Sequence, residues 1–214
     1  MIDGLITLDC EQGSEEWLAA RLGIPTGTGF KDIVRISGDR SATYIKYLAE
    51  LVEESILGLP DSRYKSDYME RGNQLEPLAR GAYEFLTGNK VQQVGGVYLD
   101  EKREVMVSPD GLIPELKKRL EIKCPKMSTH ITYIIEGGIP LEYVIQVQAN
   151  LWVTGYETWD FVSYCPEYQK QPLYLFTVER NQALMEAFDY HIPEFLTALK
   201  ALKGKPVASI TNNK

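Results

Sequence analysis

Asp110, Glu121 and Lys123 are the residues whose types and spacing could best do chemistry together. They lie in two strand-like stretches, 104–113 and 119–124, joined by a polar segment. If 114–117 forms the turn, Asp110 lies directly opposite Glu121, and opposed residues place their Cβ atoms about 5 Å apart. Glu121 and Lys123 are two positions apart on one strand and therefore share a face. The spacing predicts two carboxylates and one ammonium within a few Å.

Two facing carboxylates repel each other, and a hard cation would relieve that repulsion. Mg²⁺ favours oxygen ligands and is typically held by one or two carboxylates and several waters. Asp110 and Glu121 supply the carboxylates, and the backbone carbonyl of Ile122 could add a third ligand. Lys123 would then lie beside the attacking water, where a cation can orient it or stabilise charge developing on a phosphate. The pattern favours metal-assisted phosphodiester hydrolysis, and a sugar hydrolase that uses the carboxylate pair as acid and base is an alternative.

Helices and strands at recognisable spacing surround this hairpin. Apolar periodicity and turn residues predict helices over 14–22, 30–34, 42–57, 75–86, 140–154 and 180–203, and strands over 91–99, 104–113, 119–124, 158–165 and 173–178. Pro77 is expected only in a first turn or at a kink. The order predicts an α/β fold with a central mixed β-sheet flanked by helices. No linker interrupts the chain, so residues 1–214 are expected to form a single domain.

The composition of the 214 residues is that of an ordinary globular chain, with a formal net charge of −7. That balance argues against passive binding to nucleic acid, although a bound divalent ion changes the sign of the local field. The three cysteines are odd in number and far apart, which favours a reduced, cytoplasmic location. Neither a signal peptide nor a membrane-spanning run is apparent, so no membrane association is expected. The basic run 117–119 is expected to be an exposed hairpin turn.

Five motifs in order resemble a known nuclease family. Pro109-Asp110 followed by Glu121-Ile122-Lys123 resembles the PD-(D/E)XK nuclease signature. The likeness extends to the phage lambda exonuclease and YqaJ-like alkaline exonuclease family, through the segments 12–17 with 21–23, 71–76, 108–112, 120–125 and 143–154. The resemblance implies a restriction-endonuclease-like core. Within it, residues 12–90 would be a mainly helical part that grips the DNA end, and residues 91–203 the catalytic sheet and its flanking helices.

The resemblance also implies an activity and a metal. This activity is 5′-to-3′ digestion of double-stranded DNA, leaving a 3′ single-stranded tail for recombination by strand annealing. It would depend on Mg²⁺, for which Mn²⁺ could substitute, with two ions per site. Asp110, Glu121 and the carbonyl of Ile122 would bind metal, Glu76 would serve a second ion or its water shell, and Lys123 would assist the attacking water.

The remaining site residues implied by the resemblance lie outside the hairpin. Gln146 would position the nucleophile or the scissile phosphate, with Tyr143 and Gln148 in support. Arg21 and Thr28 would hold the 5′-phosphate of the strand being shortened. Thr28 stands where the family commonly has Ser, and the substitution keeps the hydroxyl.

The family further implies a ring-like homotrimer around the duplex and a single-strand annealing protein as partner. A bacterial or phage-infected cell is the expected setting. Two alternatives use the same core: an endonuclease or single-strand-specific exonuclease, and a non-catalytic DNA-binding recombination module. The intact set of Asp110, Glu121 and Lys123 argues against the non-catalytic alternative.

Overall fold

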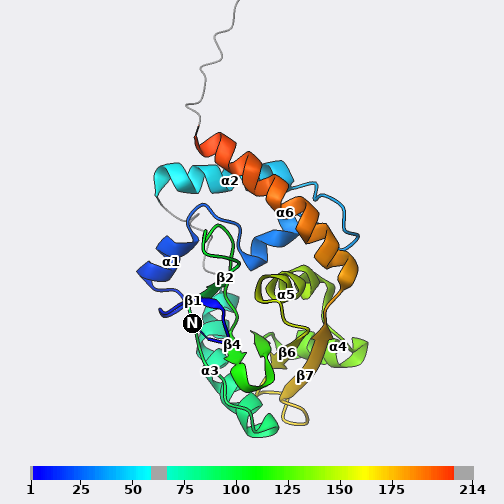
Figure 1. Cartoon of the computed structure of the whole chain (residues 1–214). Coiled ribbons are helices and arrows are strands. Elements are labelled where there is room, and N and C mark those ends of the chain that lie inside the picture. The colour runs from blue at the N-terminus through cyan, green and yellow to red at the C-terminus, as the bar shows by residue number, and fades with distance from the viewer. Residues whose placement is uncertain (1, 59–66, 205–214) are drawn as a thin grey trace, which may run out of the picture.

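Two β-sheets and a set of helices make up the computed structural model, which describes residues 2–58 and 67–204 (Figure 1). The elements in chain order are β1 (Ile6–Leu8), α1 (Glu15–Arg21), the 3₁₀ helix η1 (Gly27–Asp32), α2 (Tyr44–Leu57), α3 (Asp67–Thr87), β2 (Gly96–Tyr98), β3 (Met106–Val107), β4 (Gly111–Ile113), the 3₁₀ turn η2 (Pro114–Leu116), β5 (Lys118–Lys123), α4 (Met127–Glu136), α5 (Leu141–Thr154), β6 (Thr158–Tyr164), β7 (Leu173–Glu179) and α6 (Gln182–Lys203).

The larger sheet has the strand order β4-β5-β6-β7 and carries the predicted hairpin. β4 and β5 are antiparallel, β5 and β6 are parallel, and β6 and β7 are antiparallel, so the sheet is mixed as predicted. Ile113 pairs with Lys118 and Gly111 with Leu120. This is the register that the turn position predicted, so the mixed α/β fold and the pairing of the two strands are both confirmed.

A second sheet, of order β1-β2-β3, was not expected. The predicted strand 104–113 is wrong as one element, because it divides between β3 in this sheet and β4 in the other. Pro109 lies at the division, and a proline has no N–H to donate to a strand ladder. The predicted strand 91–99 is reduced to β2, and β1 was missed because three residues carry too little pattern.

The helices follow the prediction more closely, with three corrections. Residues 27–32 form the 3₁₀ helix η1 where an α-helix over 30–34 was expected. α3 begins at Asp67, which places Pro77 in its interior rather than in its first turn. There, packing of Ala79 and Tyr83 against the sheet holds the helix despite the hydrogen bond that a proline forgoes. α4, before Gly137, was not predicted.

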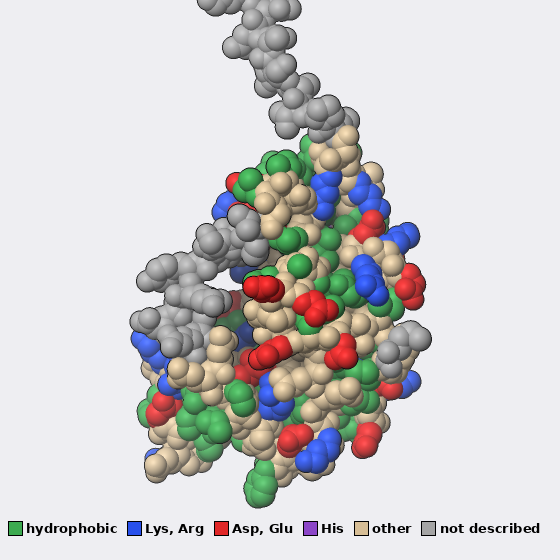
Figure 2. Space-filling view, turned by 90° about the vertical axis from the view of Figure 1, so that its left-hand side faces the viewer, with side chains coloured by type: hydrophobic (Ala, Val, Ile, Leu, Met, Phe, Trp, Pro, Cys, Tyr) green, Lys and Arg blue, Asp and Glu red, His purple; other side chains and the backbone are tan. Residues whose placement is uncertain are grey.

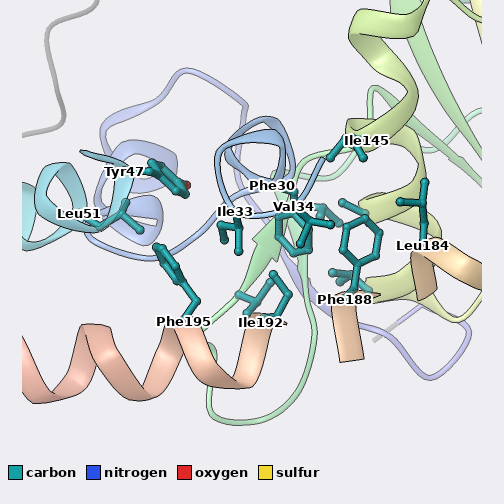
Figure 3. Packing of buried hydrophobic residues seen from close by; sticks show 14 of the residues in the cluster. Phe30, Ile33, Val34, Tyr47, Leu51, Ile145, Leu184, Phe188, Ile192 and Phe195 are labelled. Atoms are coloured by element: carbon teal, nitrogen blue, oxygen red, sulfur yellow. The ribbon is translucent and has the colours of Figure 1, made fainter. Parts of the chain in front are cut away.

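Helices cover both faces of the larger sheet. α3 packs on one face, where Tyr83 meets Leu120 and Val162, and α5 lies over the other, between the sheet and α6 (Figure 1). The largest core cluster lies beyond α5. Figure 3 shows Phe188 and Ile192 of α6 pointing toward Phe30 and Ile33. This core fixes η1 against α5, and η1 is one wall of the site described below.

The described helices include none with the length and apolarity needed to cross a membrane. The cysteines at 10, 124 and 165 are free thiols.

Candidate active site

Successive side chains of β5 face α3 and α5 in turn, and the side that faces α5 carries the site. Leu120 and Ile122 pack toward α3, so Glu121 and Lys123 face α5. The Glu121 side chain is 1% exposed, and three side chains contact it. Lys123 Nζ donates to its Oε1 at 2.6 Å, Gln146 Nε2 donates to the same oxygen at 2.6 Å, and Asn150 Nδ2 donates to Oε2 at 3.4 Å. The structure therefore brings Glu121, Lys123 and Gln146 together.

Asp110 follows Pro109 just before the β4–β5 ladder begins. Its backbone N–H donates to the Leu120 carbonyl at 3.0 Å, and its Oδ2 accepts from the Ile122 N–H at 2.6 Å. Burial and the negative charge of Glu121 raise the pKa of Asp110 well above its ordinary value, while Lys123 opposes them. The carboxylates of Asp110 and Glu121 thus repel each other in a poorly solvated place, which is the condition that a cation would relieve.

Lys123 carries the compensating positive charge. Burial tends to lower its pKa, but the carboxylates of Glu121 and Asp110 outweigh burial and raise the pKa above the ordinary lysine value. Its Nζ lies 4.9 Å from the centre of the Tyr143 ring, which in turn stacks on Phe161 at 5.7 Å. Tyr143 therefore supports the ammonium from the α5 side, and Lys123 stays protonated at neutral pH.

Glu76 approaches the cluster from α3. Its pKa is raised by burial and by the charge of Glu121, although Arg80 and Lys123 lower it. Arg80 Nη2 lies 2.5 Å from Glu76 Oε1. Sequence reasoning missed Arg80, although a position four residues along a helix places it on the same face as Glu76. Glu76 is near enough to interact electrostatically with Glu121, and its carboxylate is held by Arg80.

The motif at residues 12–17 packs against the segment that leads into Asp110. Gln12 Nε2 donates to the carbonyls of Val94 and Pro109, at 3.1 and 2.9 Å. Trp17 Nε1 donates to the Gly95 carbonyl at 2.8 Å and lies 3.1 Å from Ser108 Oγ. Gln12 and Trp17 thus hold together two segments, 94–95 before β2 and 108–109 between β3 and β4. The second of these segments leads directly into Asp110.

Arg21 and Thr28 do not touch each other but belong to one chain of polar contacts. The Arg21 guanidinium lies over Trp17 at 4.0 Å and donates to Ser108 Oγ at 3.3 Å and Thr26 Oγ1 at 3.4 Å. Thr26 Oγ1 is in turn 3.5 Å from Thr28 Oγ1. Arg21 and three hydroxyls therefore lie together, and these are the donors that a phosphate monoester requires.

A cavity of about 260 Å³ opens beside this cluster. It is lined by Thr28, Lys31, Lys123, Glu142, Tyr143 and Gln146. Gln148 does not reach it, because its amide donates to the Glu179 carbonyl and accepts from the Asn181 N–H, both at 2.8 Å. Gln148 instead ties α5 to the connection between β7 and α6.

Besides Arg80, four residues of the site or of the cavity beside it were missed from the sequence. Asn150 lies one helical turn after Gln146, so its spacing could have indicated contact with Glu121. Ser108 lies in the motif 108–112 and Thr26 lies two residues before Thr28, but only the fold shows that both contact Arg21. Lys31 lies three residues after Thr28, a spacing that becomes informative once residues 27–32 are known to be a 3₁₀ helix.

The expectation of an exposed turn at 117–119 is wrong for two of its three residues. Arg119 is 0% exposed and lies 4.0 Å from the centre of the Tyr156 ring. Lys118 Nζ lies 3.1 Å from buried Asp160, which also accepts from Tyr83 and Thr177. The strand begins at Lys118, one residue earlier than expected, so these side chains enter the packed layers rather than the turn.

Comparison with known proteins agrees with the motif resemblance. A family model described as the YqaJ-like viral recombinase domain matches residues 16–157. An alkaline exonuclease from Laribacter hongkongensis, LHK-Exo, is 34% identical with a TM-score of 0.78, covering 88% of this chain and 93% of that one.

Two further relatives were found. A phage-related exonuclease from Haemophilus somnus shares the fold, with a TM-score of 0.62 at 16% identity, over 84% of this chain and 93% of that one. The protein ExoD of Escherichia coli K12 is 39% identical over 59 residues, or 28% of this chain and 68% of its own length. The chain therefore belongs to the YqaJ-like viral recombinase family, and its fold is that of an alkaline exonuclease with a restriction-endonuclease-like core.

Proposed function

We propose that this protein is a Mg²⁺-dependent exonuclease that digests double-stranded DNA from 5′ to 3′ and leaves a 3′ single-stranded tail for recombination by strand annealing. The observation that carries the proposal is the contact set of Glu121, where Lys123 and Gln146 meet a buried carboxylate beside Asp110. LHK-Exo, the relative with 34% identity, has also been solved with dAMP bound, and a mononucleotide is what stepwise removal of nucleotides releases.

The side chains present fit one Mg²⁺ well. Among the side chains that the structure describes, no group of three or more His, Cys, Asp and Glu residues is placed to hold a metal. Two carboxylates and a carbonyl are nevertheless the usual protein share of a Mg²⁺ site, the rest coming from water and substrate phosphate. Asp110, Glu121 and the Ile122 carbonyl would hold the ion. A second ion would need Glu76 to release Arg80.

The bound ion would activate water and neutralise charge on the phosphate. The chain's own groups divide the remaining work. Lys123 presents a charged N–H beside Glu121, where it can orient the attacking water and stabilise negative charge that develops on the phosphate oxygens. Gln146 holds the Glu121 carboxylate and faces the cavity, so it can fix the position of the nucleophile or of the scissile phosphate.

A preference for 5′ ends would arise at Arg21. Its guanidinium with the hydroxyls of Thr26, Thr28 and Ser108 can bind a terminal phosphate, which carries more charge and more free oxygens than an internal one. An endonuclease has no use for such a pocket. We therefore assign residues 12–90 to gripping the DNA end and residues 91–203 to catalysis.

The acidic surface has a consequence for binding. Acidic side chains gather near the middle of the face shown in Figure 2. The exposed acidic residues of the chain include Asp9, Glu11, Glu15 and Glu16. With a net charge of −7, duplex DNA should bind poorly without divalent ions and less well as salt rises. The homotrimer and the annealing partner are part of the same proposal, and light scattering of the purified protein tests the first.

One digestion series tests the function. Linear duplexes labelled at either end, labelled single strands, nicked circles and closed circles are incubated with Mg²⁺, Mn²⁺, Ca²⁺ or a chelator, with Asp110→Asn as the inactive control. We expect 5′-end label to be released as mononucleotides in Mg²⁺ and Mn²⁺ only, and closed circles to survive. Cleavage of closed circles would show an endonuclease, loss of single strands alone a single-strand enzyme, and metal-dependent binding without cleavage a non-catalytic module.

A further inference from the structure

Lys31 faces the cavity beside the candidate active site and has no part in the assignments above. It is exposed, and it lines the same space of about 260 Å³ as Lys123 and Gln146. Within the described parts of the chain no carboxylate forms an ion pair with it. Glu142 also lines the cavity, but its Oε1 accepts from Tyr133 at 3.2 Å. Lys31 is thus a cation directed at the place where a nucleic-acid strand would meet Glu121.

The local backbone explains why Lys31 lies there. In a 3₁₀ helix, residues three apart lie one above the other, so Thr28 and Lys31 share one face of η1. Thr28 Oγ1 is 3.5 Å from Thr26 Oγ1, which contacts Arg21. One face of η1 therefore runs from the proposed 5′-phosphate pocket to the cavity beside Lys123.

η1 is a rigid base for this face. A Cβ on Gly29 would lie 2.0 Å from the Tyr47 hydroxyl, and one on Gly27 would lie 2.8 Å from Asn150 Oδ1, so both glycines allow a close approach that no other residue would. Phe30, between them and Lys31, is completely buried in the core cluster (Figure 3). The backbone under Lys31 is therefore fixed relative to Asn150, which contacts Glu121.

We propose that Lys31 binds an internal backbone phosphate of the strand being degraded, in the cavity that it lines together with Lys123. This inference rests on the proposed function and names one contact through which that function holds its substrate. A phosphate in the cavity lies between the two lysines, so the strand is held from η1 while its scissile bond meets the carboxylates. Lys31 is a substrate-binding residue, and its removal should act on affinity more than on the chemical step.

The test compares Lys31→Met with Lys31→Arg and with Lys46→Met, a control on α2 whose side chain is 78% exposed and pairs with Glu50. We expect Lys31→Met to raise KM about threefold to tenfold with kcat changed less than twofold, and Lys31→Arg and Lys46→Met to resemble the parent. Binding is measured by fluorescence anisotropy on duplexes with phosphorothioate end linkages, which keep their charge and resist cleavage. The slope of log affinity against log salt should decrease by about 1 in Lys31→Met only.

A second comparison identifies the phosphate. Single methylphosphonates, which remove one charge, are placed at successive linkages from the 5′ end. One position should weaken binding of the parent and leave binding of Lys31→Met unchanged, equally for 5′-phosphorylated and 5′-hydroxyl ends.

Two results would overturn the assignment: an unchanged salt slope, or a loss confined to 5′-phosphorylated ends, which would place Lys31 in the end pocket. Digestion by the parent protein is scored separately, so an inactive parent refutes the proposed function while the anisotropy data still decide the Lys31 contact.

Discussion

Replacing Lys123 by methionine keeps most of the side-chain volume and removes its charge. The ammonium lies 2.6 Å from Glu121 Oε1 and faces the cavity, so its loss removes one electrostatic group from the transition state. Groups of this kind contribute about 10²–10³ in kcat, or about 3–4 kcal/mol. We expect kcat to fall by at least about a hundredfold, with KM for DNA changed much less.

The same substitution should increase the affinity of the protein for Mg²⁺ while it lowers kcat. A positive charge beside Glu121 opposes a second cation at the same carboxylate, so its removal should tighten Mg²⁺ binding, by about tenfold if about 1.4 kcal/mol of repulsion is relieved. A protein that binds its metal better and cuts more slowly is the specific signature of the proposed role. A general loss of structure would weaken both properties.

Lys118 offers a matched control for folding. Its side chain is 26% exposed, as is that of Lys123, and each pairs with a buried carboxylate, Asp160 at 3.1 Å and Glu121 at 2.6 Å. At an effective dielectric constant of about 20, these separations correspond to gross attractions of about 5 and 6 kcal/mol, most of which desolvation offsets. Both methionine variants should lose up to about 3 kcal/mol of unfolding free energy, because each leaves a buried carboxylate without its lysine partner.

The assays are single-turnover digestion of an end-labelled duplex, Mg²⁺ titration by calorimetry, and urea unfolding. Only Lys123→Met should slow digestion at a temperature where both variants are folded. If Lys123→Met digests DNA within about threefold of the parent rate, or if Lys118→Met is equally slow, the role assigned to Lys123 is refuted.

Three further outcomes are expected. Gln146→Ala should lower kcat by about 10–100-fold with little change in stability. Gln148→Ala leaves two backbone groups without their partner, so it should cost about 1–3 kcal/mol in urea unfolding and leave the rate of the folded protein unchanged. The reverse pattern would exchange the roles of the two glutamines. Arg21→Ala should slow digestion of 5′-phosphorylated ends more than of 5′-hydroxyl ends, and equal slowing would remove the pocket. Hydrogen bonds from Arg71 lower the pKa of Glu167 to about 2, so the pair stabilises the protein above the unfolded pKa near 4.5 and ceases to do so as pH falls toward 2. In an acid-unfolding titration, Glu167→Gln should therefore be less stable than the parent at pH 7 and equal to it at pH 2. The difference at pH 7 should be less than about 1 kcal/mol, because the pair is largely exposed.

The hairpin that carries Asp110, Glu121 and Lys123 could be predicted from the sequence because its geometry is local. A four-residue turn fixes the register of β4 and β5, and register alone decides which side chains oppose Glu121. The same short-range logic places Gln146 on the inner face of α5, and it could have added Asn150. Each of these inferences spans one strand pair or one helical turn.

The parts that could not be predicted depend on contacts between distant segments. The small sheet pairs β1 with β2 across some 90 residues, and three-residue strands carry almost no pattern of their own. Tyr47 and Asn150 approach Gly29 and Gly27 of η1 closely, and no local propensity encodes these contacts between distant segments. Burial of Arg119 likewise depends on Tyr156, in the connection between α5 and β6.

The anchoring of Gln12 has a consequence for how the protein is made. This side chain holds carbonyls 82 and 97 positions further along the chain, so residues synthesised first complete a support for residues synthesised much later. A nascent polypeptide on the ribosome cannot form both of these contacts until Pro109 has been synthesised. Folding of the segment that leads into Asp110 is therefore completed by a side chain that was made much earlier and that must stay available for this contact.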